Sequence, residues 1–213
     1  MLDLNAILSL SLACAPGVAP ETLAAVAWTE SRFDPLAIGV NAGPRPLRRA
    51  RDAADAARLA RWLLARGAEL DLGVAQINSA NLDWLDLTVE DAFDPCRNLD
   101  AAGRVLRAGY RPRPGDRPQD ALRRALSRYN TGHPTRGFAN GYVARVETAA
   151  ARLGLSAPTA PRAPLTREAT SGPTSGAGPA VPSEPPSWDV FARAPFSAVL
   201  TFAPAAPSWS PSR

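Results

Sequence analysis

The sequence predicts an α+β fold that is mostly helical, followed by a tail without a core. Long stretches repeat apolar residues at helical spacing, which predicts amphipathic helices. The stretches 36–46 and 70–78 are short, apolar and interrupted by glycine, and they predict a small irregular β region. The composition changes near Gly154, where large apolar residues give way to Pro, Ser, Ala, Thr and Gly. We therefore expect one folded domain over 1–154 and a tail over 155–213.

The predicted helices can be bounded in order along the chain. The first follows the N-terminus, where Leu4, Ile7 and Leu8 recur at helical spacing. The second begins at Pro20, because proline suits the first turn of a helix, and runs to about Arg32. Further helices are expected over 51–67, 98–110, 118–130 and 137–154.

The tail carries twelve of the 22 prolines of the chain beyond position 155. Such a segment cannot bury enough apolar surface to offset the entropy of ordering it, so we expect disorder or extended polyproline-like structure. Aromatic residues return over 187–203, with Trp188, Phe191 and Phe196. This stretch is either a remnant without consequence or a short docking motif for a partner, and the sequence leaves both readings open.

Charge and hydropathy exclude several classes of protein. The net charge is +4 and the pI about 9.8. The sequence contains arginine but no lysine, and the arginines are interleaved with acidic residues. We therefore expect no nucleic-acid partner. Basic character can still attract an anionic polymer over long range. No stretch is long and apolar enough for a transmembrane segment. The N-terminus carries Asp3 and lacks the basic residues of a signal peptide, so it does not explain export.

The two cysteines, Cys14 and Cys96, have neither a CxxC spacing nor a histidine at metal-binding distance in the sequence. We therefore expect no metal site and no cofactor. Two readings remain open from the residues alone. The cysteines are buried thiols, or they form one disulfide that places the protein outside the cytoplasm. Such a bond would close a loop of roughly 80 residues and contribute up to about 4 kcal/mol.

Glu30 lies in the stretch AWTESRFDP, at the C-terminal end of the second predicted helix. Helical spacing puts it on the same face as Leu23 and Val26, which look like core residues. The helix dipole disfavours a negative charge at this end. Glu30 is therefore either a solvated surface residue or a proton carrier whose pKa is raised.

Three short motifs follow one another along the chain. They are Glu30-Ser31, the stretch DLGVAQIN at 71–78, and SRYNTG at 127–132. Each is weak alone, but their order and spacing are specific together. They resemble the soluble lytic transglycosylases, whose pattern is Glu-Ser, then Gly-Leu-Met-Gln-Ile-Asn, then Ala-Tyr-Asn-x-Gly. Val74-Ala75 takes the place of the common Leu-Met pair.

Longer stretches resemble the transglycosylases of type IV secretion and conjugation systems: CAPGVAPETLAAVAWTESRFDPLAIGVN, LDLGVAQINSANL, FDPCRNLDAAGRVL and YNTGHPTRGFANGYVARV. The resemblance spans roughly 12–153. It implies a lysozyme-like fold, a disulfide between Cys14 and Cys96, a periplasmic location and peptidoglycan glycan strands as substrate. It also makes type IV secretion subunits candidate partners for the tail. We expect a monomer.

The resemblance also implies roles for individual residues. Glu30 would protonate the leaving oxygen and then act as base toward the 6-hydroxyl of the sugar, which closes a 1,6-anhydro ring. Tyr129 would orient Glu30. Ser31, Gln76 and Asn130 would form hydrogen bonds in the cleft, and Gly73 would let the backbone approach the sugar. Asn78 is expected to be structural.

Two further functions remain alternatives. If Asp34 or Asp71 faced Glu30, the enzyme would be a lysozyme-type hydrolase with two carboxylates, although Asp34 fits a turn cap better. The chain could instead be a non-catalytic peptidoglycan-binding assembly module of a secretion apparatus. The products discriminate among these, since hydrolysis leaves a reducing sugar and transglycosylation an anhydro end.

Overall fold

The computed structural model describes residues 1–155. The predicted tail, with its docking motif at 187–203, lies outside the described residues. The helices are α1 Leu4–Cys14, α2 Pro20–Ser31, α3 Ala53–Leu64, α4 Leu82–Leu85, α5 Pro95–Gly109, α6 Pro118–Thr131, α7 Arg136–Ala139 and α8 Tyr142–Arg152, with 3-10 turns η1 Ser79–Asn81 and η2 Asp91–Phe93. The strands are β1 Ile38–Ala42, β2 Glu69–Leu72 and β3 Ile77–Asn78.

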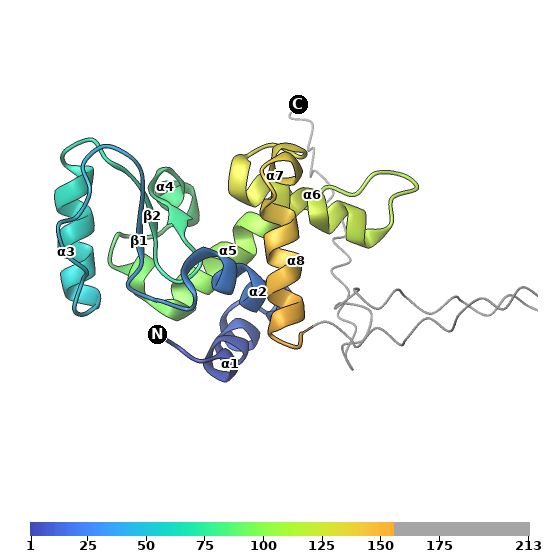
Figure 1. Cartoon of the computed structure of the whole chain (residues 1–213), viewed down its shortest axis with the longest axis horizontal. Coiled ribbons are helices and arrows are strands. Elements are labelled where there is room, and N and C mark those ends of the chain that lie inside the picture. The colour runs from blue at the N-terminus through green and yellow to red at the C-terminus, as the bar shows by residue number, and fades with distance from the viewer. Residues whose placement is uncertain (156–213) are drawn as a thin grey trace, which may run out of the picture.

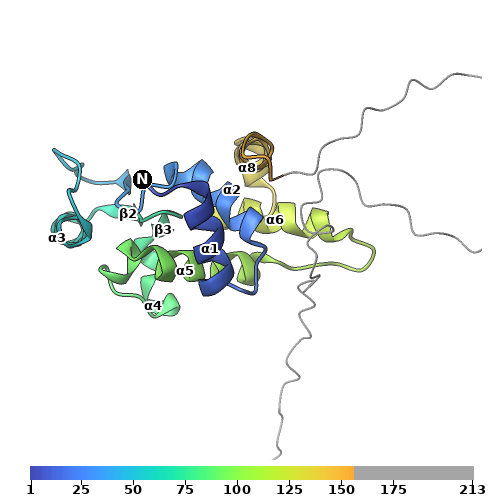
Figure 2. The same cartoon turned by 90° about the horizontal axis from the view of Figure 1, so that it is seen from below.

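The helices and the sheet occupy different parts of the domain. Figures 1 and 2 both place α3 at one end and α6 and α8 at the other. Helix α2 packs against α1 and α8, and α5 packs against α1 and α6. The sheet lies between these helices and α3. This arrangement confirms the predicted fold class of a mostly helical, lysozyme-like α+β domain.

The sheet is antiparallel with strand order β1-β2-β3. Asp71 on β2 pairs with Gly39 on one side and with Asn78 on the other. Register shifts between Val40 and Ala42, so the outer strand is irregular there. The sheet lies within the stretches predicted for it, except that β2 begins one residue earlier.

Helix boundaries follow local signals in the sequence. Proline stands at the first turn of α2, α5 and α6, where its missing N–H costs nothing. The residues that follow α2 and α6, Arg32 and Gly132, are both in the left-handed region that closes helices. Asp52 caps α3 by accepting a hydrogen bond from the backbone N–H of Asp55 at 2.7 Å.

The prediction of one helix over 137–154 is wrong, because two helices, α7 and α8, occupy this stretch. Gly141 adopts a φ of +76°, which stops α7 and reorients the chain. The side chain of Asn140 then accepts a hydrogen bond from the backbone N–H of Tyr142 at 2.9 Å. The break places Tyr142 at the first position of α8, a position that matters for the site below.

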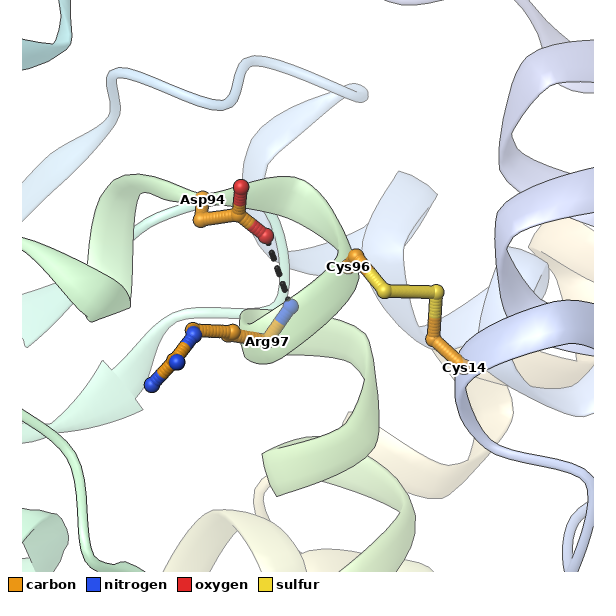
Figure 3. The surroundings of a disulfide bond; sticks show 4 residues. All are labelled: Cys14, Asp94, Cys96 and Arg97. Carbon is orange, nitrogen blue, oxygen red and sulfur yellow. Dashed lines mark hydrogen bonds between the residues drawn. A yellow bond between two sulfur atoms is a disulfide. The ribbon is translucent and has the colours of Figure 1, made fainter.

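Cys14 and Cys96 form a disulfide, as the family resemblance implied (Figure 3). The bond joins the end of α1 to the first turn of α5, with the two Cα atoms 5.5 Å apart. The same turn is capped by Asp94, which accepts a hydrogen bond from the backbone N–H of Arg97 at 2.9 Å. The disulfide thus connects two helices that also pack directly.

Within residues 1–155, no helix is long and apolar enough to span a membrane.

Candidate active site

A cavity of about 530 Å³ opens between the sheet side and the helical side of the domain. This volume falls in the range of ligand-binding clefts. Its wall includes nine residues of the three sequence motifs, namely Glu30, Asp71, Gln76, Ile77, Asn78, Arg128, Tyr129, Asn130 and Gly132. The fold therefore brings together residues that lie about a hundred positions apart in the sequence.

Glu30 is partly buried in this wall, one residue before the end of α2. Burial raises the pKa of its carboxyl from 4.5 to about 7. The nearby charge of Asp71 raises this pKa as well, while the hydrogen bond from Tyr142 and the charge of Arg145 lower it. Of the two readings open from the sequence, this geometry favours the proton carrier. A glutamate with this pKa is about half protonated at neutral pH.

The hydroxyl that reaches Glu30 belongs to Tyr142, which donates to its Oε1 at 2.6 Å. The expectation that Tyr129 forms this contact is wrong. Tyr129 instead donates to the backbone oxygen of Ala75 at 2.6 Å, because α6 points its ring across the cavity toward the turn after β2. No local pattern in the sequence points to Tyr142. Its contact with Glu30 depends on the helix break at Gly141 and joins residues 112 positions apart.

Three helices hold the backbone turn that follows β2. Asn98 of α5 is fully buried, and its amide accepts from the N–H of Ala75 at 2.8 Å and donates to the carbonyls of Leu72 and Ala92. From α2, Ser31 donates to the carbonyl of Val74 at 2.6 Å. Tyr129 of α6 supplies the third contact, to Ala75. Sequence reasoning missed Asn98.

Ser31 and Gly73 both have structural roles, and their predicted roles toward a substrate stay predictions. The hydroxyl of Ser31 donates its hydrogen bond to the carbonyl of Val74, and neither Ser31 nor Gly73 lines the cavity. Gly73 adopts a φ of +75°, and a Cβ there would lie 2.1 Å from the carbonyl oxygen of Ala92. Glycine is needed for this close approach of the backbone to the protein interior.

Gln76 and Asn130 both line the cavity, as their predicted role requires. Gln76 has a left-handed backbone with a φ of 51°, and its side-chain amide donates to the carbonyls of Gly73 and Ala37. Asn130 accepts a hydrogen bond from the amide of Asn140 at 2.8 Å through its oxygen. Both keep polar atoms at the wall, and their contact with a substrate stays a prediction.

Asp71 is the second carboxylate of the cavity wall. One oxygen accepts from the side-chain amide of Asn41 at 2.9 Å and the other from that of Asn78 at 2.8 Å. The sheet thus fixes this carboxylate from both neighbouring strands. Asp34, by contrast, accepts from the backbone N–H of Leu36 in a turn and does not line the cavity.

Replacing Tyr142 by phenylalanine should raise the pKa of Glu30 further. The hydroxyl donates to the charged form of the carboxyl, so its loss removes a stabilisation of that form and shifts the pKa upward by roughly one pH unit. Carbon-detected NMR titration of Glu30 measures this shift. Tyr129→Phe is the matched control and should leave this pKa near its wild-type value, because that hydroxyl contacts Ala75. A pKa that stays constant or falls in Tyr142→Phe would contradict the assignment.

The arrangement can transfer a proton in a partly dry cleft lined by amides and by a second carboxylate. Within the part of the chain that the structure describes, there is no group of three or more His, Cys, Asp or Glu side chains that could hold a metal ion. Glu30, with its raised pKa at the cavity wall, supports acid and base catalysis by a side chain.

Most of the chain is similar to known proteins. The family described as "Transglycosylase SLT domain" matches residues 8–151. "Protein virB1" from Rhizobium radiobacter is 49% identical over 141 residues, which are 66% of this chain and 59% of that protein. "Type IV secretion system protein virB1" from Brucella abortus biovar 1 is 43% identical over 135 residues, which are 62% of this chain and 56% of that protein.

The chain thus spans less than three fifths of the length of these curated relatives. No solved structure matches it. The family match covers well over half of the chain and contains all three motifs together with Tyr142 and both cysteines. The chain belongs to the transglycosylase SLT domain family.

Proposed function

We propose that the protein is a lytic transglycosylase of peptidoglycan. It cleaves the β-1,4 bond between N-acetylmuramic acid and N-acetylglucosamine and leaves a 1,6-anhydro end. The single observation that carries this proposal is the placement of Glu30. It lies at the wall of an open cavity, its pKa is about 7, and Tyr142 holds one of its oxygens. Membership of the family supports the same activity.

In the first step the protonated Glu30 gives its proton to the glycosidic oxygen, and the bond from that oxygen to C1 breaks. The raised pKa keeps a large fraction of Glu30 protonated at neutral pH, which this step requires. The sugar develops positive charge at C1. Asp71, held by Asn41 and Asn78, places a negative charge on the same cavity wall and favours that state.

In the second step the Glu30 carboxylate accepts the proton of the sugar's own 6-hydroxyl, and O6 forms a bond to C1. Glu30 ends protonated, as it began, and no water is consumed. The hydrogen bond from Tyr142 keeps the carboxylate in place between the two steps. Gln76 and Asn130 are proposed to hold acetamido and hydroxyl groups of the glycan, and Tyr129 to act indirectly by holding the turn that carries Gln76.

Mass spectrometry of purified peptidoglycan digested by the wild type and by Glu30→Gln tests this function. Anhydromuropeptides from the wild type alone are the expected result. Reducing-end products would instead establish a hydrolase. A folded protein that binds the wall and releases no product would establish the non-catalytic assembly module.

A lysozyme-type hydrolase is the second candidate, because Asp71 shares the cavity with Glu30 and raises its pKa. Under our proposal Asp71→Asn should retain anhydro products, lower the rate about tenfold, and shift the basic limb of the pH–rate profile to lower pH. Asp34→Asn, in a turn outside the cavity, is the matched control. A loss of activity of roughly a thousandfold or more in Asp71→Asn, with reducing-end products from the wild type, would favour the hydrolase.

The relatives' names also suggest a setting. Those from Brucella are named as type IV secretion system proteins. We propose that this chain opens the wall locally for such an apparatus, that it acts in the periplasm as a monomer, and that 187–203 docks a subunit of the apparatus. A disulfide between Cys14 and Cys96 supports an oxidising compartment.

A further inference from the structure

Two arginines, Arg111 and Arg128, line the cavity where its wall is formed by the end of α5 and by α6. Arg111 is exposed at the start of the α5–α6 loop, and Arg128 is partly buried in the last turn of α6. This side of the wall is built from the helical side of the domain, whereas Asn41, Asp71 and Trp84 line it from the sheet and α4. The cavity wall thus carries two guanidinium groups as well as the carboxylates of Glu30 and Asp71.

Among residues 1–155, neither guanidinium forms an ion pair with an acidic side chain. Arg128 donates from Nη1 to the carbonyl of Gly109 at 2.9 Å, and Arg111 donates from Nε to the carbonyl of Ala108 at 3.4 Å. Each guanidinium has five N–H donors, and each of these two hydrogen bonds uses one of them.

The surroundings of Arg128 are positively charged. Its pKa is lowered first by burial and then by the charges of Arg111, Arg124 and Arg113. Asp116, in the loop before α6, accepts hydrogen bonds from Arg124 and from the backbone N–H of Arg113. Like charges gathered beside a cleft disfavour the empty site, and a bound anion offsets that cost.

The glycan backbone itself offers no matching group. Its sugar hydroxyls and acetamido groups are neutral. Where a stem peptide is attached, the lactyl carboxyl of the muramic acid forms an amide bond with it and carries no charge. The stem peptides carry free carboxylates, and arginine binds a carboxylate through two parallel hydrogen bonds. We propose that Arg111 and Arg128 form a subsite that binds a stem-peptide carboxylate, an inference that rests on the proposed function. The enzyme then prefers glycan strands that still bear their peptides.

The test uses soluble glycan strands in two forms. One is native, and in the other the peptide carboxylates are converted to amides with a carbodiimide and ammonium ion. The wild type should lose about tenfold in kcat/KM on amidated strands, the effect expected for one charge-assisted hydrogen-bonded contact. Arg111→Gln and Arg128→Gln should lose about tenfold on native strands and show no further loss on amidated ones.

Arg66→Gln is the matched control for net charge, since Arg66 is exposed beside Trp62 just after α3. Figure 1 shows α3 at the end of the domain opposite to α6. Arg66→Gln should behave like the wild type on both substrates. Arg128→Gln removes the hydrogen bond to Gly109 and could disturb folding. Arg111 is exposed, so Arg111→Gln tests the subsite even in that case.

The outcomes distinguish a failure of the proposed subsite from a failure of the proposed function. Cleavage of both substrates at equal kcat/KM by the wild type would overturn the subsite and leave the transglycosylase intact. Cleavage of neither substrate would overturn the function itself. Strands stripped by an amidase carry only lactyl carboxylates. A wild-type preference for these over native strands, lost in the arginine variants, would overturn the assignment to stem peptides.

Discussion

Glu30→Gln is expected to lower the rate of glycan cleavage by roughly a thousandfold or more, and to stabilise the domain above pH 7 at the same time. Glutamine keeps the size of the side chain and can still accept the hydrogen bond from Tyr142. It carries no transferable proton, so both proposed steps are lost. Product release from peptidoglycan, followed by mass spectrometry, measures the first effect.

The second effect follows from the pKa of Glu30, which is about 7 in the folded protein against 4.5 as its ordinary value. Between these two pH values the folded state holds a proton that the unfolded state has released, so wild-type stability falls as pH rises. The glutamine variant escapes this loss. Its free energy of unfolding should match the wild type at pH 4 and exceed it by up to about 3 kcal/mol at pH 8.

Urea unfolding at pH 4 and pH 8 measures this difference. Glu69→Gln makes the same chemical change at an exposed position of β2 and serves as control. A Glu30→Gln variant whose stability differs from the wild type by the same amount at both pH values would show that Glu30 does not hold its proton in the fold, and the proposed acid step would lose its basis.

Removal of the disulfide is expected to cost roughly 4 kcal/mol, because the bond closes a loop with a sequence separation of 82 residues. This is a large share of the 5–15 kcal/mol that holds most domains folded. Urea unfolding with and without reductant measures the loss in the wild type. The double variant Cys14→Ser/Cys96→Ser should have the reduced stability and no response to reductant. A loss below about 1 kcal/mol would mean that packing of α1 on α5 alone holds these helices together.

Much of the fold could be predicted from the sequence because its signals are local. Prolines mark the starts of α2, α5 and α6, and apolar periodicity marks the buried faces. The prediction of a single helix over 137–154 failed because it relied on the same local signals. Helical periodicity continues across Gly141, and only the left-handed conformation of that residue in the folded chain reveals the break.

The site was predicted less completely, since its contacts join distant parts of the chain. Glu30, Gln76 and Asn130 were found through their motifs, and all three line the cavity. A motif shows that a tyrosine is present but not which group its hydroxyl meets. Tyr129 and Tyr142 both carry hydroxyls near Glu30, and the packing of α8 against α2 brings the hydroxyl of Tyr142 to the carboxyl.

The turn after β2 owes its shape to Ser31, Asn98 and Tyr129, which come from three helices far apart in the chain. No single one of these helices can form the site, and a chain that has not docked all three has no formed site. The wall-cutting activity that we propose is therefore a late product of folding. On this proposal, a nascent or unfolded chain leaves the glycan intact, and the chain gains its activity on the cell wall only once its domain is complete.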